Sequence, residues 1–367
     1  MPDEKISQKT LNSTPIGSDQ VPIVDDPTGT PETQRTTIEN LVGYLVTTAG
    51  DILYATASRT LARLGIGTAG QVLTVNGAAD GVEWTSKFTP DRVFSPGGRL
   101  TLTTATPVTI ADVTAATTIY YTPYMHDSIS LYDGSSWTVY QFTEKSVSVP
   151  ATTTTPFDIF GYASGGALAL ETLDWTNDTT RATALALQDG RLVKSGAATR
   201  LYLGTGRTTS VSGQTEDSDT SRFLWNMYNR RPRFQFCSDT TNTWAYTIAT
   251  WRAQNADTTV GVGRVDFVIG VAETLVEAVN YNFCVGASGI FVGSGVGIDS
   301  TSVNSAQMTG ARLETSAVPV GTYKGYPAVG YHYAQRLEVS TASGTTNWYG
   351  DNGVTYVQSG MHVQFNG

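Results

Sequence analysis

Three histidines are the side chains in this sequence best suited to acid–base or metal chemistry, and they lie far apart. His126, His332 and His362 have no partner at the spacing of an HxxxH, HExxH or Cys-X-X-Cys site, in which neighbouring ligands converge on one metal ion. His332 belongs to an alternating Tyr-His-Tyr-Ala-Gln run, where an exposed or hydrogen-bonded strand position is the ordinary interpretation. We therefore expect no metal site, no cofactor and no catalytic residue, and so a protein that is not an enzyme.

The acidic cluster of Glu216, Asp217 and Asp219 lacks the spacing and the bidentate Glu of a calcium-binding EF-hand loop. We interpret it as a solvated loop that caps a helix within residues 216–228, where Phe223, Leu224 and Met227 share one face. Glycosidase chemistry needs two carboxylates about 5–10 Å apart, and spacing along the chain does not establish such a pair.

Two glycine-rich stretches, residues 204–207 and 293–297, lack the strand–loop–helix context and the Lys of a phosphate cradle, so they are predicted to be turns. The basic run Asn-Arg-Arg-Pro-Arg at residues 229–233 has two open interpretations. It either docks on an acidic neighbouring subunit or forms a solvated loop.

Aromatic side chains in exposed turns suit glycan binding, because a ring face stacks on sugar C–H groups while nearby Asn and Asp bind hydroxyls. Trp348, Tyr349, Asp351 and Asn352 form such a set and are the predicted receptor contacts. Trp137, at a hairpin, is a second position of this kind. Ordinary packing within a sheet is the alternative for each.

Composition narrows the class of protein. Only 15% of the 367 residues are charged, and Thr, Ser, Gly and Tyr are abundant, which favours β structure. A net charge of −9 and a pI near 4.8 argue against nucleic-acid binding. Apolar runs are too short for membrane insertion, and residues 1–20 lack the pattern of a secretory signal. Cys237 and Cys284 lie in apolar strands, so buried thiols are expected, with a disulfide as the alternative.

Alternating strands separated by turns begin near residue 101 and continue to residue 367. Turn signals recur about every 8–12 residues, which predicts an antiparallel β-sandwich or jelly-roll-like head domain over residues 101–367. Its clearest hairpin is residues 128–142. Another hairpin turn is expected at residues 349–353, and residues 87–100, rich in Pro and Gly, are the predicted linker.

Residues 50–84 form a compact unit punctuated by glycines. Residues 71–75 and 82–84 are predicted strands around a turn, while Leu61 and Leu64 have the spacing of one helical turn. Fully burying one Leu or Ile contributes roughly 1.5–3 kcal/mol, whereas ordering one residue's backbone costs about 1–2 kcal/mol. A unit with so few large apolar residues is not expected to close a core alone, and needs copies of itself or a neighbour.

The sequence GDILYATASRTLARLGIGTAGQVLTV, followed by Trp84, resembles a recurrent module of tailed-bacteriophage virion appendages, the tail fibres and head fibres. The resemblance implies a small β module at residues 46–86 that forms a homotrimer. Its predicted trimer-interface residues would line the shared interior: Ile52, Tyr54, Leu61, Leu64, Ile66, Val72 and Trp84. No heptad pattern accompanies them, so a coiled coil is not expected to hold the oligomer.

Residues 1–45 are polar and contain several prolines, which predicts an extended arm. Within it, residues 20–24 are β-capable, and Thr37 is placed to cap a short helix within residues 36–45. The arm resembles the N-terminus by which phage fibres attach to other virion proteins. Its predicted virion-anchor residues are Val21, Ile23, Val24, Ile38 and Leu41.

Taken together, the sequence predicts a mainly β protein of the virion, assembled in the bacterial cytoplasm. We expect a non-enzymatic fibre or spike subunit whose head adheres to the host surface, with a cell-surface glycan as the possible ligand. A head fibre or decoration protein attached to the capsid is the alternative, and a polysaccharide-cleaving tailspike a more distant one. The sequence does not decide between attachment to the tail and attachment to the capsid.

Overall fold

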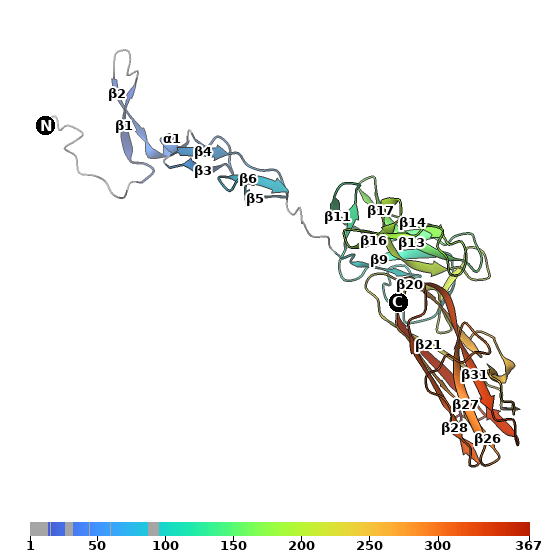
Figure 1. Ribbon diagram of the computed structural model, residues 1–367. Helices are drawn as coiled ribbons and strands as arrows, with labels where there is room; N and C mark the ends of the chain where they lie inside the picture. The colour runs from blue at the N-terminus through green and yellow to red at the C-terminus, as the bar shows by residue number, and fades with distance from the viewer. Residues whose placement is uncertain (1–13, 15, 26–31, 44, 59, 87–94) are drawn as a thin grey trace. The chain divides into compact units, whose positions relative to one another are not determined.

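The protein is described here from a computed structural model that places residues 14, 16–25, 32–43, 45–58, 60–86 and 95–367 (Figure 1). The chain divides into two compact units, Met1–Asp91 (unit 1) and Arg92–Gly367 (unit 2). In the described residues both units are built mainly from antiparallel β-sheets, with a parallel pairing between β19 and β24 in unit 2, which confirms the predicted mainly β fold. The described residues contain no helix that is long and apolar enough to cross a membrane.

The described residues of unit 1 form a series of two-stranded hairpins with one short helix. The hairpins are β1–β2, β3–β4 and β5–β6, and α1 follows β2. The bounds are β1 (Gln20–Asp25), β2 (Glu32–Thr37), α1 (Ile38–Gly43), β3 (Ile52–Ala57), β4 (Thr60–Leu64), β5 (Gln71–Val75) and β6 (Val82–Ser86). The strand predicted at residues 20–24, the hairpin at residues 71–84 and the capping role of Thr37 are confirmed; the Thr37 Oγ1 accepts a hydrogen bond from the Asn40 N–H at 3.1 Å.

The helical turn expected at Leu61 and Leu64 is wrong, because both residues lie on β4. Leu64 pairs with Ile52 and Leu61 pairs with Ala55 across the β3–β4 hairpin. Cross-strand pairing satisfies the backbone groups that a single isolated helical turn would leave without partners.

The first part of unit 2 buries a hydrophobic cluster, core 1, among three sheets. Leu100, Ile119, Ile129, Phe157 and Leu203 are examples of its buried side chains. The sheets are β12–β9–β7, β10–β11 and β14–β13–β17–β16–β15, with β20 paired to β17. The bounds are β7 (Gly98–Thr101), β9 (Thr118–Pro123), β10 (Ser128–Tyr132), β11 (Trp137–Gln141), β12 (Lys145–Ser148), β13 (Pro156–Ser164), β14 (Ala167–Asp174), β15 (Leu185–Gln188), β16 (Arg191–Lys194), β17 (Ala197–Arg207) and β20 (Leu224–Asn226).

A second cluster, core 2, lies between an eight-stranded sheet and the four-stranded sheet β21–β33–β25–β30, and it also includes Phe160, Tyr202 and Trp225 of the sheet that contains β13, β17 and β20. Phe267 of the larger sheet contacts Phe365 of the smaller one, with ring centroids 5.4 Å apart. The larger sheet contains β8 (Val113–Ala116), β18 (Thr215–Asp217), β19 (Ser221–Arg222), β23 (Arg252–Ala253), β24 (Arg264–Ile269), β27 (Phe291–Ile298), β28 (Ala311–Arg312) and β31 (Gly330–Ser340). The smaller one contains β21 (Pro232–Ser238), β25 (Val276–Tyr281), β30 (Val320–Gly325) and β33 (Gly360–Asn366).

Core 3 is smaller and surrounds the sheet β22–β32–β26–β29. Trp348 and Cys284 are fully buried in it, and Leu313 packs beside them. The bounds are β22 (Thr243–Ala245), β26 (Phe283–Gly286), β29 (Ser316–Ala317) and β32 (Thr346–Tyr349), and a short 3₁₀ segment, η2 (Gln254–Ala256), follows β23.

Buried ion pairs connect these layers within unit 2. Arg181 Nε donates to Asp158 Oδ2 at 2.7 Å, and Arg181 Nη2 donates to the Gly270 carbonyl at 2.6 Å. Asp158 belongs to β13, whereas Gly270 directly follows β24. Desolvation by burial raises the pKa of Asp158 against the opposing effect of Arg181.

Several sequence-based predictions about unit 2 are wrong. The helix expected within residues 216–228 is replaced by β18, β19 and β20, because Leu224 and Trp225 pair with β17 and are buried. The hairpin expected at residues 349–353 does not form, because β32 and β33 belong to different sheets. The linker expected at residues 87–100 is shorter, since Arg99 and Leu100 are buried on β7; residues 87–94 lie outside the described part.

The glycine-rich stretches are strands rather than turns, because their glycines let layers approach closely. A Cβ on Gly204 would lie 2.3 Å from the Trp225 carbonyl oxygen, and one on Gly206 would lie 2.4 Å from the Phe157 ring. Gly293 and Gly295 of β27 lie against Trp251 in the same way. Nothing larger than hydrogen fits where these strands pass their neighbours.

Candidate functional site

Asp51 holds together the module at residues 50–84. Its carboxylate accepts hydrogen bonds from the backbone N–H groups of Thr47, Thr48 and Ile66 at 2.9–3.1 Å and pairs with Arg63 at 3.1 Å. These bonds, led by the one from Thr47, lower the pKa of Asp51. The Asp of the Gly-Asp motif therefore closes the start of β3 onto the end of β4.

Trp84 joins the two hairpins of the module. Its indole N–H donates to the Gly65 carbonyl at 2.7 Å, and its ring lies where a side chain on Gly67 would stand. Gln71 closes the turn that leads into β5, because its Oε1 accepts a hydrogen bond from the Thr68 N–H at 2.7 Å. The glycines and the Trp of the motif thus have structural roles within a single chain.

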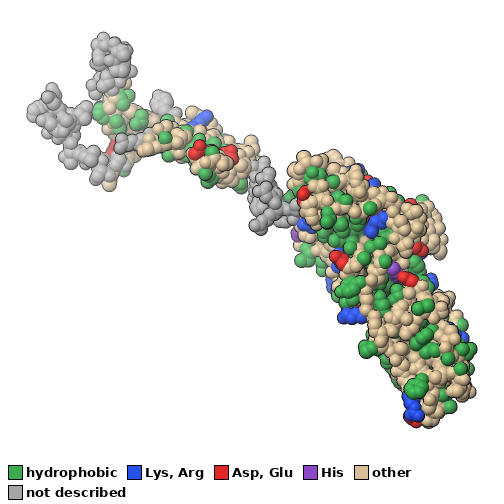
Figure 2. Space-filling model, viewed as in Figure 1, with side chains coloured by type: hydrophobic (Ala, Val, Ile, Leu, Met, Phe, Trp, Pro, Cys, Tyr) green, Lys and Arg blue, Asp and Glu red, His purple; other side chains and the backbone are tan. Residues whose placement is uncertain are grey.

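No apolar residue in the described part of unit 1 is buried, whereas unit 2 contains three buried hydrophobic clusters. Val75 is 65% exposed, Ile66 57% and Leu61 55%. Figure 2 shows hydrophobic side chains reaching the surface along unit 1. Unit 1 therefore keeps apolar area available for association.

The seven residues predicted to line a trimer interior do not all share one face. Alternation along the β3–β4 hairpin puts Ile52, Tyr54 and Leu64 on one face and Leu61 on the other. Along the β5–β6 hairpin, Trp84 shares its face with Leu73, which lies opposite it, while Val72 points the other way. Leu73 and Val75, which the sequence analysis missed, therefore belong with Trp84, and period-two counting from Trp84 identifies them.

The predicted anchor residues lie on β1 and α1. Ile23 is 40% exposed and Leu41 is 51% exposed, whereas Val21 and Ile38 are half-buried. The side chain of Val24 lies outside the described part of the structure. Their role in attachment stays a prediction.

The predicted receptor contacts do not form a surface set. Trp348 is 0% exposed, and its indole N–H donates to the Tyr246 carbonyl at 3.2 Å within core 3. Tyr349 packs against Phe283 with ring centroids 5.4 Å apart. Asp351 caps its own turn by accepting from the Gly353 N–H at 2.8 Å, next to the exposed Asn352. Sheet packing, the alternative interpretation, explains Trp348.

The acidic cluster is only partly solvated, because Asp219 is exposed whereas Asp217 is not. Asp217 is buried between Arg222, at 3.2 Å, and Arg233. The basic run is likewise held within unit 2, because Arg233 takes part in this pair and Arg230 pairs with Glu273 at 2.5 Å. These contacts correspond neither to docking on an acidic neighbouring subunit nor to a solvated loop.

Hydrogen bonding and burial account for the remaining candidates. His332 is bonded to Asp299 Oδ2 at 2.7 Å and to the Ala328 carbonyl at 2.9 Å, which confirms the hydrogen-bonded interpretation. Cys237 and Cys284 are buried free thiols, and burial raises the pKa of each to about 12. Within the described residues, no group of three or more His, Cys, Asp or Glu side chains could hold a metal ion.

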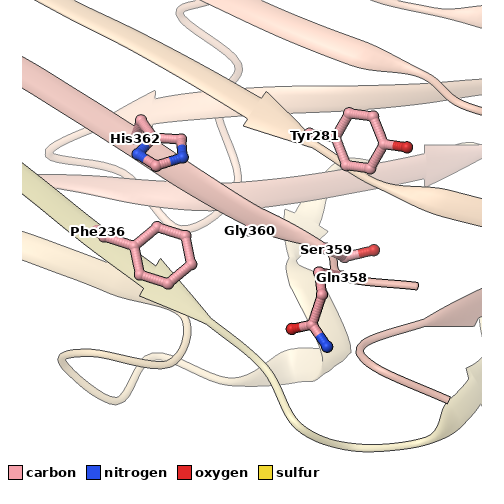
Figure 3. A pocket seen from close by; sticks show the side chains of 6 residues that line it. All are labelled: Phe236, Tyr281, Gln358, Ser359, Gly360 and His362. Atoms are coloured by element: carbon pink, nitrogen blue, oxygen red, sulfur yellow. The ribbon is translucent and has the colours of Figure 1, made fainter. Parts of the chain in front are cut away.

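Unit 2 exposes an apolar face that the sequence analysis missed, on the side of the sheet β21–β33–β25–β30 away from core 2. We call it the outer face and define it by five side chains that are 36–59% exposed: Phe234, Phe236, Val279, Tyr281 and Val320. A hollow of about 460 Å³ opens on this face, with Phe236, Tyr281, His362 and Gly360 among its lining residues (Figure 3).

Alternation along β21 was visible in the sequence, but it did not show which side faces inward. Hydrophobicity favours burying Phe234 and Phe236, yet the structure buries Arg233, Gln235 and Cys237 instead. Arg233 forms an ion pair with Asp217, and the Gln235 amide donates a hydrogen bond to the Asp266 carbonyl at 2.7 Å. Partners from distant strands therefore decide the orientation of β21.

Comparisons with known proteins identify no family. No protein-family model matches the chain, and no curated protein matches it. Among solved structures, the insecticidal delta-endotoxin Cry8Ea1 from Bacillus thuringiensis is similar over 72% of this chain and 51% of its own, with 6% identity and a TM-score of 0.21. The insecticidal crystal protein Cry7Ca1 of the same organism is similar over 73% and 50%, with 9% identity and a TM-score of 0.15.

The chain spans about half the length of these two toxins. The structure of infectious bursal disease virus, Gx strain, is similar over 65% of this chain and 67% of the viral one, with 10% identity and a TM-score of 0.18. TM-scores this low support no inference about function.

Proposed function

We propose that the protein is a non-enzymatic subunit of a bacteriophage fibre or spike. Unit 1 associates as a homotrimer, residues 1–45 attach the subunit to other virion proteins, and unit 2 is the head that adheres to the host surface. The sequence resemblance of residues 50–84 to phage appendage modules supports the class of protein. The observation that carries the proposal is that no apolar residue in the described part of unit 1 is buried, and Leu61, Ile66 and Val75 are more than half exposed.

The physical argument concerns the stability of unit 1. An isolated two-stranded hairpin is at best marginally stable in water, and unit 1 consists of such hairpins. Fully burying a Val, Leu or Ile side chain contributes about 1.5–3 kcal/mol. If copies of unit 1 associate and cover the exposed Leu61, Ile66 and Val75, the assembly gains this free energy of burial, which a single copy lacks.

The association is tested by the mass of the full-length protein in light scattering after size exclusion. We expect three times the 39.2 kDa of one chain. The double variant Ile66→Asp/Val75→Asp is expected to dissociate to monomers, because it places charges in an apolar contact. The matched control is Val211→Asp in unit 2, where Val211 is 52% exposed, and this variant should keep the wild-type mass. A well-folded wild-type monomer would contradict the proposal.

Attachment is tested on intact phage particles with gold-labelled antibodies against unit 2. We expect label on the particles, and its position distinguishes a tail fibre from a capsid-attached head fibre. A chain that lacks residues 1–45 should form the same oligomer but remain absent from particles. Normal incorporation of the truncated chain would refute the anchoring role of these residues.

A further inference from the structure

We propose that the outer face of unit 2 packs against the same face of other copies of this chain. The inference rests on the proposed function, because unit 1 is what brings the copies together. It goes further by assigning a second homotypic contact to the head domain, at residues that share no sheet with the module at residues 50–84.

The outer face carries apolar side chains from β21, β25 and β30, and the His362 ring of β33 lies between those of β21 and β25. Phe236 pairs with His362, which pairs with Val279, so these side chains form one row across β21, β33 and β25. Tyr281 pairs with Val320 in the next row. Phe234, which is 59% exposed, extends the surface along β21. Contiguous exposed apolar side chains of this kind mark an interaction surface rather than ordinary solvent exposure.

The charge on this face suits an identical partner. Its outward strand positions carry two formal charges, Glu277 and Lys324, and these pair with each other. The face is therefore neutral, although the whole chain has a net charge of −9. A second copy therefore meets no like-charge repulsion there, even though each chain carries a net negative charge.

The lining of the hollow is mostly apolar, which favours a protein surface over a sugar. Ser359 is 1% exposed, and its Oγ already accepts the Phe283 N–H at 3.0 Å. The Gln358 amide donates to the Val354 carbonyl at 3.1 Å. Figure 3 shows that the remaining lining side chains are the rings of Phe236, His362 and Tyr281. Saccharide recognition needs several free hydrogen-bonding groups beside the ring, whereas an apolar side chain from another copy needs only space.

Gly360 provides that space between the rings. The Phe236 ring lies over it, since a Cβ on Gly360 would be 2.9 Å from Phe236 Cε2. A side chain at this position would displace the ring and fill part of the hollow. The hollow of about 460 Å³ is large enough to receive an aromatic side chain from a second copy.

The connection between the units is short, so even a weak contact between copies of unit 2 can form once unit 1 has associated. Eight residues separate Ser86 from Ser95, so this segment spans at most about 30 Å when fully extended. Subunits joined through unit 1 then hold their heads at a high effective concentration, and a contact too weak to join free heads still forms.

The test compares side-chain exposure in the oligomer and in the monomer by carbene footprinting with mass spectrometry. The full-length wild type is labelled beside the monomeric Ile66→Asp/Val75→Asp variant. We expect Phe234, Phe236 and Tyr281 to be labelled several-fold less in the wild type. Ile110 and Leu187, which are 100% and 71% exposed, should be labelled equally in both and serve as internal controls.

A second pair of variants keeps the test independent of unit 1. Phe236→Lys/Tyr281→Lys should leave the oligomer intact through unit 1, raise the labelling of Phe234 and lower the unfolding temperature of unit 2. The matched control, Leu187→Lys/Val211→Lys, should change neither quantity. If the Phe236/Tyr281 variant behaves like the control, the head contact is absent.

The outcomes separate the two proposals. An oligomeric wild type whose outer face is labelled as strongly as in the monomer overturns the head contact alone. A monomeric wild type overturns self-association through unit 1, and the head contact with it. An outer face that is labelled in the oligomer and becomes protected only when host polysaccharide is added identifies a sugar-binding surface, which also overturns the inference.

Discussion

Unit 1 and unit 2 consist of the same kind of strand but reach stability in different ways. Unit 2 places its strands in sheets of up to eight and buries large side chains such as Trp225 and Trp348 completely. The described part of unit 1 uses two-stranded hairpins, and none of its apolar residues is buried. The difference shows that a β segment becomes self-sufficient only when sheets can cover each other, and otherwise keeps apolar area for a partner.

Hydrogen bonding differs between the units in the same direction. In unit 1 the side-chain hydrogen bonds join residues that are close in the sequence. The bond from Trp84 to Gly65 has the greatest sequence separation among those of the module. In unit 2, Arg99 of β7 donates to the Gly367 carbonyl at 2.9 Å, and Asn226 accepts the Leu100 N–H at 2.7 Å. Local bonds define a shape in unit 1, whereas distant bonds in unit 2 also determine which strands meet.

The largest expected effect comes from Trp225→Ala in unit 2. Trp225 is 0% exposed, stacks near Tyr202 and donates from its indole N–H to Thr274 Oγ1 at 3.2 Å. Its removal should cost about 3–5 kcal/mol of unfolding free energy, because a cavity remains in core 2. Hydrogen exchange with mass spectrometry in urea should show earlier unfolding of unit 2 peptides only.

The matched control is Leu187→Ala, at a position that is 71% exposed, and it should change stability by less than about 0.5 kcal/mol. If Trp225→Ala also removes protection from unit 1 peptides, the two units unfold together and the comparison above fails.

A smaller effect is expected from adding one methyl group to a glycine in each unit. Gly204→Ala would place a Cβ 2.3 Å from the Trp225 carbonyl oxygen and 2.7 Å from Leu100 Cδ1. Backbone atoms cannot move aside cheaply, so unit 2 should lose about 1–3 kcal/mol. Gly77→Ala in unit 1 meets no atom within 4 Å and should be neutral within about 0.5 kcal/mol. Denaturant midpoints of the two variants measure the difference, and equal midpoints would show that β17 is packed loosely.

The smallest expected effect is a dependence on pH that distinguishes two aspartates. The pKa of Asp51 is lowered from its usual 3.8, chiefly by the hydrogen bond from Thr47, so its stabilising effect is complete above 3.8 and is lost as the pH falls through the lowered value. The β3–β4 hairpin should therefore open in acid. In Asp51→Asn the same hairpin should be weaker at neutral pH and respond little to acid.

Asp133 provides the comparison in unit 2. Its pKa is lowered to about 2, first by the Ser136 backbone bond, so its effect is lost between pH 3.8 and about 2. The β10–β11 hairpin should stay protected even so, because Ile129 and Leu131 anchor it in core 1. Amide exchange corrected for its intrinsic pH dependence reports both hairpins. Equal acid opening of the two would show that core 1 does not support β10–β11.

The features that the sequence predicted correctly depend on neighbours along the chain. The turn over residues 133–136 and the strands on either side of it follow from alternation and turn chemistry within fifteen residues. Capping by Thr37 and the hairpin around residues 76–81 belong to the same class. These features need no knowledge of the rest of the fold.

The errors concern contacts between distant residues. Residues 216–228 have a helical pattern of apolar positions, but pairing with β17 makes Leu224, Trp225 and Asn226 a strand. The glycines of β17 and β27 signalled turns, but the close approach of Trp225 and Trp251 explains them. Propensity is a weak signal, and pairing with an existing strand overrides it.

By itself, the sequence determined that this protein is rich in β structure and low in charge, and that a glycine-punctuated N-terminal segment differs from a larger region of alternating strands. It did so because composition, turn residues and alternation act over short distances. Only the tertiary structure decided that Trp348 is buried while Phe234 and Phe236 face outward. Which side of a strand faces inward depends on the hydrogen-bonding partners available to its polar residues. Arg233 pairs with Asp217 and Gln235 with the Asp266 carbonyl, and both partners lie on other strands.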